Sequence, residues 1–253
     1  MKISIVTPVL NRVETLNDTL QSVSSQTYSN IEHIVQDGGS TDGSAELARN
    51  WIGQHEVYLQ SAADQGLYDA LNKGIARCNG DIVGLLGSDD FLSDSRVVSD
   101  VATAFSDTSI DGVYGDLDLI YASGRVMRHW RAGSFQRNRM RWGWMPPHPT
   151  LYLRRAVFER FGAYDASFRI AGDYDAMLRW VWSGKIRLAY VPRVLVKMRQ
   201  GGVSTGSVSG LLTKTLEDYR ALRRNHVGGA ATLAVKNLRK LGQFSALMRS
   251  AGH

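Results

Sequence analysis

The sequence predicts an α/β protein with a single mainly parallel sheet, flanking helices and a basic helical tail. Short apolar runs alternate with helical patterns through residues 1–118, which is the succession expected of βαβ units. The 253 residues are 43% hydrophobic and 21% charged, enough to bury a full core. The single cysteine, Cys78, excludes a disulfide framework and a zinc-type spacing, and its helical pattern favours a buried position.

Residues 1–118 are expected to form strands that alternate with helices. Strands are expected in "KISIVTPVL", "IEHIVQDGG", "HEVYLQS" and "DIVGLLGS". The helix after the first strand places Leu16, Leu20 and Val23 on one face. The other helices are expected in "STDGSAELARNWI", with Ser40, Thr41 and Asp42 as capping candidates, in "GLYDALNKGIARC" and around residues 95–105, before "GVYGD".

The pattern changes after residue 118. "DLIYASGRVMRHW" predicts a hairpin around Ser123 and Gly124. The Arg/Trp stretch "RHWRAGSFQRNRMRWGWMPPHPT", residues 128–150, has little periodicity and is typical of a mobile binding segment. Helices are then expected in "RRAVFERFG" and "DYDAMLRWVWSG", and two strands in "IRLAYVP" and "VLVKMR".

Charge is divided unevenly along the chain. Residues 1–118 hold 18 acidic and 6 basic side chains, residues 119–210 hold 4 and 16, and residues 211–253 hold 2 and 8. We expect an anionic partner to meet the second half and the acidic half to need cations. The sequence shows neither a signal peptide nor a run of ~20 apolar residues, so we expect a cytoplasmic protein.

Aspartates follow most of the predicted strands. Ligands of parallel sheets bind beyond the carboxyl ends of the strands. The residues expected there are Thr7-Pro8, Asp37, Asp64, Ser88-Asp89-Asp90 and Asp116. Each aspartate alone is also a common turn residue, but the set indicates a divalent cation with oxygen ligands, Mn2+ or Mg2+.

Five motifs in order resemble those of the inverting family 2 glycosyltransferases of the GT-A fold. They are "TPVLNR", "DGGSTDGS", "ADQGLYDALNKGI", "GDIVGLLGSDD" and "AGDYDAMLR", and the resemblance covers roughly residues 1–205. The third motif is most similar to bacterial members that build exopolysaccharides or decorate glycolipids. The resemblance implies a GT-A domain over residues 1–210, with a nucleotide-sugar-binding half (1–118) and an acceptor-binding half (119–210). Residues 211–253 would form the tail.

The resemblance implies metal-dependent transfer of a hexosyl group from a nucleotide diphosphate donor, a UDP-sugar above all, to an acceptor hydroxyl. The positions matching donor contacts are Thr7, Pro8, Glu14, Asp37, Asp64, Gly66, Asn72, Lys73, Asp89 and Arg199. Asp90 matches the metal ligand of the DXD-like motif, and Asp173 matches the general base. Gly172 stands where the family often has a second acid, so we expect Asp175 to be an ordinary helix residue.

The acceptor side is expected to include His148, Trp142 and Trp144. His148 could equally be a packed loop residue. Relatives often have His before the "GGVS"-like turn, where this chain has Arg199 and Gln200, so Arg199 is expected to neutralise phosphate.

The basic tail suits a lipid-linked acceptor at an anionic membrane surface. Its apolar positions are Leu233, Val235, Leu238, Leu241, Phe244 and Leu247, interleaved with Lys236, Arg239 and Lys240. A tail helix packed on the domain explains the same pattern equally well.

Two other functions fit the sequence less well. A nucleotidyltransferase would carry a Gly-rich, basic phosphate loop after its first strand, which "TPVLNR" lacks. A degenerate scaffold that only binds nucleotide or membrane would not need Asp90 and Asp173. We expect no nucleic-acid partner.

Overall fold

The computed structural model describes residues 1–200 and 208–236, and within them nine strands form one sheet. The strands are β1 (Ile3–Val9), β2 (Ile31–Asp37), β3 (Val57–Ser61), β4 (Ile82–Leu85), β5 (Phe91–Leu92), β6 (Gly112–Ile120), β7 (Val126–Trp130), β8 (Tyr152–Arg154) and β9 (Leu188–Arg199). The α-helices are α1 (Val13–Ser24), α2 (Ser44–Arg49), α3 (Leu67–Ala76), α4 (Val97–Ala104), α5 (Arg155–Phe161), α6 (Gly172–Met177) and α7 (Val208–Arg224). The chain also has short 3-10 helices η1 (Arg137–Trp142) and η2 (His148–Thr150), a π-helix η3 (Leu178–Ser183) and a helical stretch over residues 230–236.

The predicted α/β class is confirmed, and the sheet is parallel in its first half and mixed in its second. Its strand order is β3-β2-β1-β4-β8-β6-β9-β5, with β7 paired to β6. Strands β3, β2, β1 and β4 are parallel, whereas β8 runs antiparallel to both β4 and β6. The short strands β5 and β8 were not expected from the sequence, because two or three residues carry no readable period.

The two strands expected in "IRLAYVP" and "VLVKMR" are one strand, β9. It pairs in parallel with β6, and the register shifts between Gly115 and Leu117. Pro192 lies in the irregular part of β9, between the partners of Gly115 and Asp116. Proline cannot donate to a ladder, so a bulge lets the strand continue past it.

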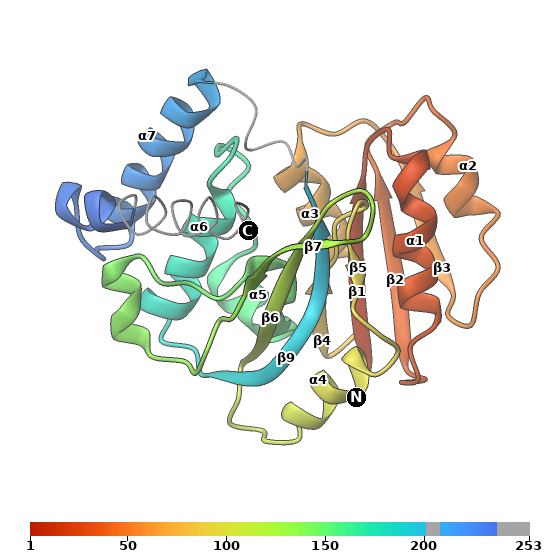
Figure 1. Cartoon of the computed structure of the whole chain (residues 1–253), viewed down its shortest axis with the longest axis horizontal. Helices are drawn as coiled ribbons and strands as arrows, with labels where there is room; N and C mark the ends of the chain where they lie inside the picture. Colours follow the sequence, from red (N-terminus) through yellow and green to blue (C-terminus); the bar gives the residue numbers. More distant parts are fainter. Residues whose placement is uncertain (201–207, 237–253) are drawn as a thin grey trace, which may run out of the picture.

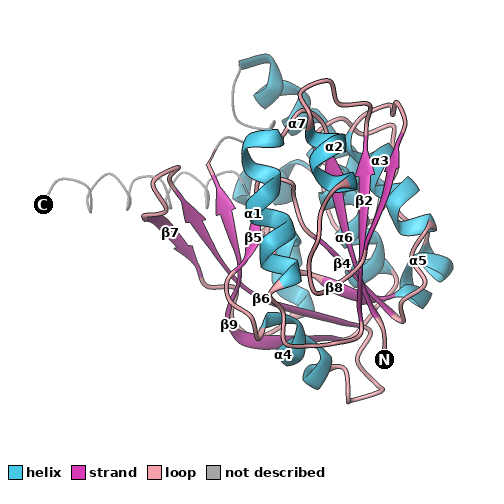
Figure 2. Cartoon of the chain, turned by 90° about the vertical axis from the view of Figure 1, so that its right-hand side faces the viewer, coloured by secondary structure: helices cyan, strands magenta, loops and turns pink. Residues whose placement is uncertain are grey.

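Helices cover both faces of the parallel half (Figure 2). Val6 and Ile34 pack with α3 residues, while Val9 and Val35 pack with α1 and α2 residues. Alternate strand residues point to opposite faces, so these pairs place α3 on one face and α1 and α2 on the other. The predicted apolar face of α1 is buried as expected.

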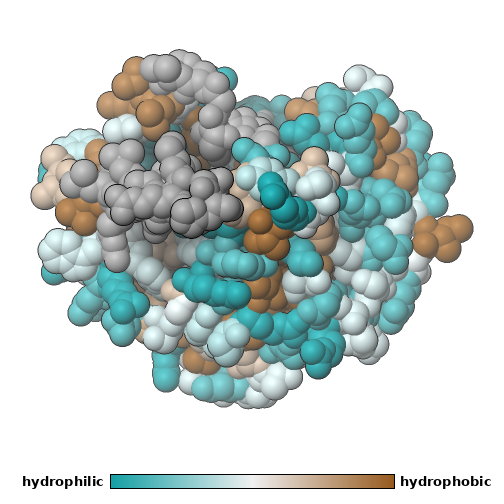
Figure 3. Space-filling model, in the orientation of Figure 1, coloured by the Kyte–Doolittle hydropathy of each residue, from teal (hydrophilic) through white to brown (hydrophobic). Residues whose placement is uncertain are grey.

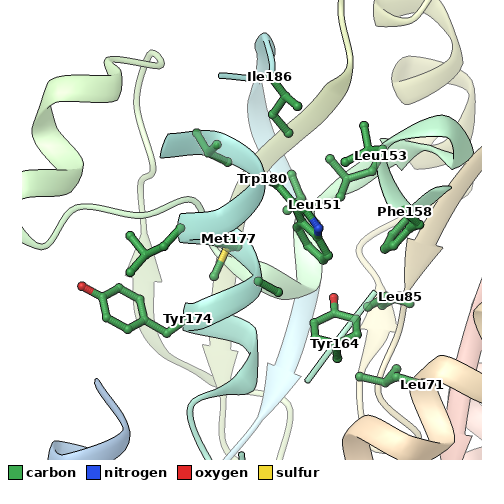
Figure 4. Close-up of a cluster of buried hydrophobic side chains, with 14 of the residues drawn as sticks. Leu71, Leu85, Leu151, Leu153, Phe158, Tyr164, Tyr174, Met177, Trp180 and Ile186 are labelled. Carbon is green, nitrogen blue, oxygen red and sulfur yellow. The ribbon is translucent and has the colours of Figure 1, made fainter. Parts of the chain in front are cut away.

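The largest buried side chain is Trp180 of η3. Its ring meets Phe158 and Tyr164 edge-on at centroid distances of 5.2 and 5.4 Å, and its Nε1–H donates to the Gly162 carbonyl at 2.9 Å. Figure 4 shows Trp180 between residues of α5, β8 and η3, with Leu151 and Leu153 beside it. This cluster fixes α6 and η3 against the sheet.

The Arg/Trp stretch is packed, contrary to the expectation of a mobile segment. It forms β7 and η1, and Met140 is fully buried. Arg137 donates to the carbonyl oxygens of Val181, Lys185 and Ile186 at 2.9–3.0 Å. The arginine therefore satisfies main-chain groups of a distant segment, which a periodicity argument cannot detect.

The C-terminal helix α7 packs beside α6 (Figure 1). Ala221 and Leu222 of α7 are fully buried. Lys236 forms an ion pair with buried Asp218 at 2.7 Å and places its ammonium 3.2 Å from the centre of the Tyr174 ring. The described part of the tail, through residue 236, thus packs on the domain.

The remaining predicted tail positions, Leu238, Arg239, Lys240, Leu241, Phe244 and Leu247, lie outside the described residues. Among the helices that are described, none is long and apolar enough to cross a membrane.

Candidate active site

The acidic turn after β4 is held in place by α1. The hydroxyl of Thr19 donates to the main-chain oxygen of Asp90 at 2.7 Å, and the hydroxyl of Thr15 donates to that of Ser88 at 2.9 Å. The turn is closed by a hydrogen bond from the Asp90 N–H to the Gly87 carbonyl at 3.0 Å. Two threonines one helical turn apart thus fix the backbone that carries Asp89 and Asp90.

Both carboxylates of this turn converge over the bare Cα of Gly87. A Cβ built on Gly87 would lie 2.8 Å from Asp90 Oδ2 and 3.1 Å from Asp89 Oδ1. Asp90 is 6% exposed. Burial, and next to it the charge of Asp89, raises the pKa of Asp90 to about 7.

A hard divalent cation fits this pair of carboxylates, because it accepts oxygen ligands and would offset their repulsion. Across residues 1–200 and 208–236, no three His, Cys, Asp or Glu side chains are grouped so as to hold a metal. A cation here would therefore complete its ligand shell with water or substrate oxygens, which is how magnesium usually binds.

Arg199, at the end of β9, borders the acidic turn. Its main-chain N–H donates to Asp90 Oδ1 at 3.2 Å, and its guanidinium donates to the Asp89 carbonyl at 3.2 Å. The same guanidinium pairs with Asp18 of α1 and lies over the Phe91 ring. Asp18 was not expected at the site, because its contact to Arg199 spans most of the chain and leaves no local pattern.

Asp37 ends β2 with its carboxylate fully buried. Oδ2 accepts hydrogen bonds from the N–H groups of Gly39 and Ser40, both at 3.0 Å, and from the Ser61 hydroxyl at 2.6 Å. Burial acts to raise the pKa of Asp37, but these hydrogen bonds outweigh it and lower the pKa. Oδ1 is buried and has no hydrogen-bond partner among the residues that the structure describes.

The other residues expected near the first strand differ in exposure. The Thr7 side chain is fully buried, and its hydroxyl lies 2.8 Å from His33 Nε2. It therefore lies inside the sheet and does not face its edge. Pro8 is half-buried, and Glu14 is exposed in the first turn of α1.

The third motif folds as a turn leading into α3. Asp64 Oδ1 accepts the Gly66 N–H at 2.9 Å, and its carboxylate lies against Gly38, where any Cβ would collide with it. Gly66 has φ 114°, a conformation that glycine tolerates. The structure thus brings Asp64 next to the loop after Asp37.

Asn72 and Lys73 are engaged by neighbouring groups. The Asn72 amide donates to the Tyr164 carbonyl at 2.8 Å and accepts the Tyr164 N–H at 2.9 Å, so it holds the loop between α5 and α6. Lys73 pairs with Asp69 at 2.8 Å and donates to the Ala63 carbonyl at 3.1 Å. Either side chain would have to release a partner to bind a donor.

Asp173 lies in the first turn of α6, half-buried and beside Tyr68 of α3. Its main-chain N–H donates to the Tyr68 hydroxyl at 3.2 Å. Because α3 follows β3, its first turn lies at the carboxyl edge of the parallel strands, and this contact places Asp173 at the same edge.

His148 stands near Asp173 and is bonded to Tyr164. Its Nε2 lies 2.7 Å from the Tyr164 hydroxyl. Burial lowers the pKa of His148, and the charge of Asp173 partly opposes this. His148 is thus both packed and next to the candidate base.

Asp175 is an interior residue of α6, as expected. It is fully buried, its Oδ1 accepts the Asn225 amide at 3.0 Å, and its Oδ2 lies 3.5 Å from Arg179. An acceptor hydroxyl cannot reach the Asp175 carboxylate unless the contacts with Asn225 and Arg179 break.

Asp116 does not belong to the acidic edge, contrary to expectation. It lies in the middle of β6, because the strand continues to Ile120. It accepts the Ala132 N–H at 2.8 Å and the Tyr190 hydroxyl at 2.7 Å, and it pairs with Arg131 at 3.1 Å. Its charge is compensated within the fold.

The two tryptophans expected at the acceptor side have different surroundings. Trp144 is half-buried, packs edge-on against Tyr114, and donates its Nε1–H to the Ala132 carbonyl at 3.0 Å. Trp142 ends η1 and is 59% exposed. Of the two, only Trp142 presents most of its surface.

Comparisons with known proteins show which sequences and folds this chain is similar to. The model of the family described as glycosyl transferase family 2 matches residues 4–167. A PGL/p-HBAD biosynthesis glycosyltransferase of Mycobacterium tuberculosis is 28% identical over 225 residues, which cover 87% of this chain and 82% of that protein.

Two solved structures share the fold at low sequence identity. The crystal structure of S. aureus TarS 1-349 with UDP-GlcNAc has a TM-score of 0.67 at 17% identity and covers 90% of this chain, which spans 66% of that one. The mannosyltransferase PcManGT from Pyrobaculum calidifontis, in complex with GDP-Man and Mn2+, has a TM-score of 0.68 at 16% identity and covers 99% of this chain and 74% of its own.

Proposed function

The chain belongs to glycosyl transferase family 2, and from this premise we propose that it transfers a hexose from a UDP-sugar to an acceptor hydroxyl with inversion and with a divalent cation. One observation carries the proposal. Three carboxylates in different settings stand at one edge of the sheet: Asp37 ends β2, Asp90 follows β4, and Asp173 adjoins the first turn of α3. Base recognition, charge neutralisation and proton removal need three such groups.

Asp37 supports the choice of a uracil nucleotide. Its buried Oδ1 is an acceptor without a partner, and a buried acceptor left unpaired costs about 1–3 kcal/mol. The imino N–H of uracil would satisfy it. Asp64, next to Gly38, and Gly66 would line the path from the base toward the sugar.

Asp89 and Asp90 would hold Mn2+ or Mg2+ at the turn after β4. Such a cation would neutralise negative charge on the diphosphate leaving group. Arg199 adds a guanidinium at the same turn, which suits it to a diphosphate oxygen. Its pairing with Asp18 fixes the guanidinium beside the acidic turn before a donor binds.

Asp173 would act as the general base. As the acceptor oxygen attacks the anomeric carbon, the bond from that carbon to the diphosphate breaks, and the hydroxyl proton passes to the Asp173 carboxylate. Attack opposite the leaving group inverts the anomeric configuration. His148, near Asp173, and exposed Trp142 would contact the acceptor.

The acceptor is proposed to be a lipid-linked saccharide at an anionic membrane surface. Support comes from α7, where Leu211, Leu212 and Leu216 are 63–70% exposed. Figure 3 shows apolar residues gathered at the α7 end of the molecule. The eight basic residues of positions 211–253 would add attraction to anionic lipid.

The decisive experiment compares Asp173→Asn with Asp175→Asn. The first variant keeps the size of the side chain but cannot accept the proton, and losing a positioned base typically lowers the rate ~10²–10⁴-fold. It should bind UDP and melt like the parent while releasing almost no UDP from UDP-sugars. Asp175→Asn should instead lower the melting temperature, because Asp175 is buried against Asn225 and Arg179.

Release of UDP from a panel of UDP-sugars, with water or simple saccharides as acceptors, measures both variants. Asp173→Asn with the parent rate would remove the base from this motif. A parent protein that binds UDP but turns over no donor would favour a scaffold.

A further inference from the structure

The segment Arg169–Asp173, which carries the candidate base, is held by side chains from two distant helices. We propose that Glu217 of α7 and Tyr68 of α3 are positioning residues that fix the backbone of Asp173. This inference rests on the proposed function, because it assigns Asp173 as the base.

Glu217 accepts three main-chain hydrogen bonds from this segment. Its Oε1 accepts the Arg169 N–H at 2.8 Å, and its Oε2 accepts the N–H groups of Ile170 and Ala171 at 2.9 and 2.8 Å. The segment leads directly into α6, whose own N-cap residue, Ala171, has no side chain that can cap. A carboxylate from α7 therefore pairs the N–H groups of the three residues that lead into α6, up to and including its N-cap residue.

Tyr68 holds the same segment through its hydroxyl. Its hydroxyl donates to the Ile170 carbonyl at 2.7 Å and accepts the Asp173 N–H at 3.2 Å. Its ring is 5% exposed and stacks on Tyr164 at 5.6 Å between ring centroids. The hydroxyl is thus fixed by packing on one side and by two main-chain bonds on the other.

Gly172 makes this arrangement possible. A Cβ on Gly172 would lie 2.7–2.9 Å from the ring atoms of Tyr68, closer than packing allows. The absence of a second acid before Asp173 therefore has a structural reason, because the Tyr68 ring occupies the space that such a side chain would need.

Together, Glu217 and Tyr68 bond five main-chain groups between Arg169 and Asp173. A displacement of about 1 Å at a reacting group can lower a rate ~10²-fold. Glu217 belongs to α7, so part of the alignment of the candidate base comes from a helix that follows it by more than thirty residues.

The test is a double-mutant cycle. Glu217→Gln keeps one acceptor oxygen but replaces the other by an amide that cannot accept an N–H, and Tyr68→Phe removes only the hydroxyl. Each is made in the full-length parent and in Asp173→Asn. We expect each to lower kcat by about 10- to 100-fold in the parent, with unchanged UDP affinity, and to cause no further loss in Asp173→Asn.

Two matched controls carry the same chemical changes elsewhere. Glu159→Gln alters a 61% exposed glutamate of α5, and Tyr28→Phe removes a hydroxyl that donates to the Met1 carbonyl at 2.6 Å. Neither should change kcat.

The positioning role would be overturned if Glu217→Gln or Tyr68→Phe lowered kcat in Asp173→Asn by the same factor as in the parent. It would also be overturned if either variant weakened UDP binding as much as it lowered kcat. So would parental kcat in Tyr68→Phe, a variant that keeps the packed ring and therefore remains informative if Glu217→Gln folds poorly. Parental activity of Asp173→Asn would instead refute the base itself, and with it the proposed mechanism.

Discussion

At the scale of single residues, the two oxygens of the Asp37 carboxylate have different partners. Oδ2 accepts three hydrogen bonds, two from the loop after β2 and one from Ser61 at the end of β3, whereas buried Oδ1 accepts none from the described residues. The three donors fix the orientation of the carboxylate and keep it ionised. A ligand N–H that reaches Oδ1 therefore meets a preorganised acceptor, whose cost of orientation was met during folding.

Asp37→Asn tests this acceptor. The NH2 group of the asparagine must point either toward the N–H groups of Gly39 and Ser40 or toward the N–H of the ligand. In either orientation two hydrogen-bond donors face each other, so one hydrogen bond is lost. We expect UDP affinity to fall by roughly 10- to 100-fold, equivalent to about 1–3 kcal/mol. Isothermal titration with UDP measures it.

The control for this variant is Asp81→Asn, which alters an exposed aspartate that accepts the Lys2 N–H at 2.8 Å before β4 begins. Equal UDP affinity in Asp37→Asn and the parent would contradict the assignment of Oδ1 to the uracil. So would a parent that binds GDP more tightly than UDP.

At the scale of elements, α7 has two distinct faces. One face packs inward through Asp218, Ala221 and Leu222, and Glu217 contacts the segment before α6. Leu212 and Leu216 lie away from this face and are exposed, and Leu211 is exposed near the start of the helix. The inward face makes α7 part of the domain, although its basic composition is typical of a surface tail.

Truncation of the tail should therefore affect stability. Deleting residues 228–253 removes Lys236 from Asp218, whose side chain is only 3% exposed. Lys214 remains 3.1 Å from Asp218, so the Asp218 carboxylate keeps one cationic partner and the loss of stability is smaller. We expect the free energy of unfolding to fall by roughly 1–3 kcal/mol. Each kcal/mol lowers Tm by about 2–4 °C in a protein of this size.

Lys236→Met should reproduce much of this loss, because it keeps an apolar stem and removes the charge. Deleting only residues 237–253 is the matched control, since it leaves Lys236 in place. Thermal unfolding compares the three proteins, and a 228–253 deletion that melts like the parent would contradict the packing role. Sedimentation of the same proteins with anionic vesicles, at low and high salt, measures whether either part of the tail binds lipid.

At the scale of the whole molecule, the acidic half and the basic half meet at the turn after β4. Asp89 and Asp90 come from the half with 18 acids, and Arg199 comes from the half with 16 bases. A divalent cation would balance the residual acidity of this turn and would also attract a diphosphate to it. Ligand binding there should stabilise the entire fold, because only the folded chain assembles the site.

Thermal unfolding with UDP and Mn2+ tests this. At a ligand concentration of ~100 Kd, binding contributes about 2.7 kcal/mol, so Tm should rise by roughly 5–10 °C. Excess EDTA should remove most of the shift, and Asp90→Ala should behave like the chelated parent. Asp81→Ala should keep the full shift. A shift that survives EDTA in the parent would remove the metal from the proposal.

Some features followed from the sequence because they depend on residues close together in the chain. The buried face of α1, with Leu16, Leu20 and Val23, follows from helical spacing. The hairpin around Gly124 follows from turn chemistry, and Asp37, Asp89 and Asp90 stand just after apolar runs. Local periodicity and turn residues are enough to fix such elements.

The tertiary structure decided what depends on distant pairs. It placed Asp116 inside β6, joined two expected strands into β9, and packed Arg137 against carbonyl oxygens of η3 and the loop after it. It also brought Glu217 to the backbone before Asp173, across more than forty residues of chain. Such contacts arise when separate elements pack together, and no periodicity within one segment encodes them. For this reason the sequence identified the carboxylates of the candidate site, while only the fold showed what holds each of them in place.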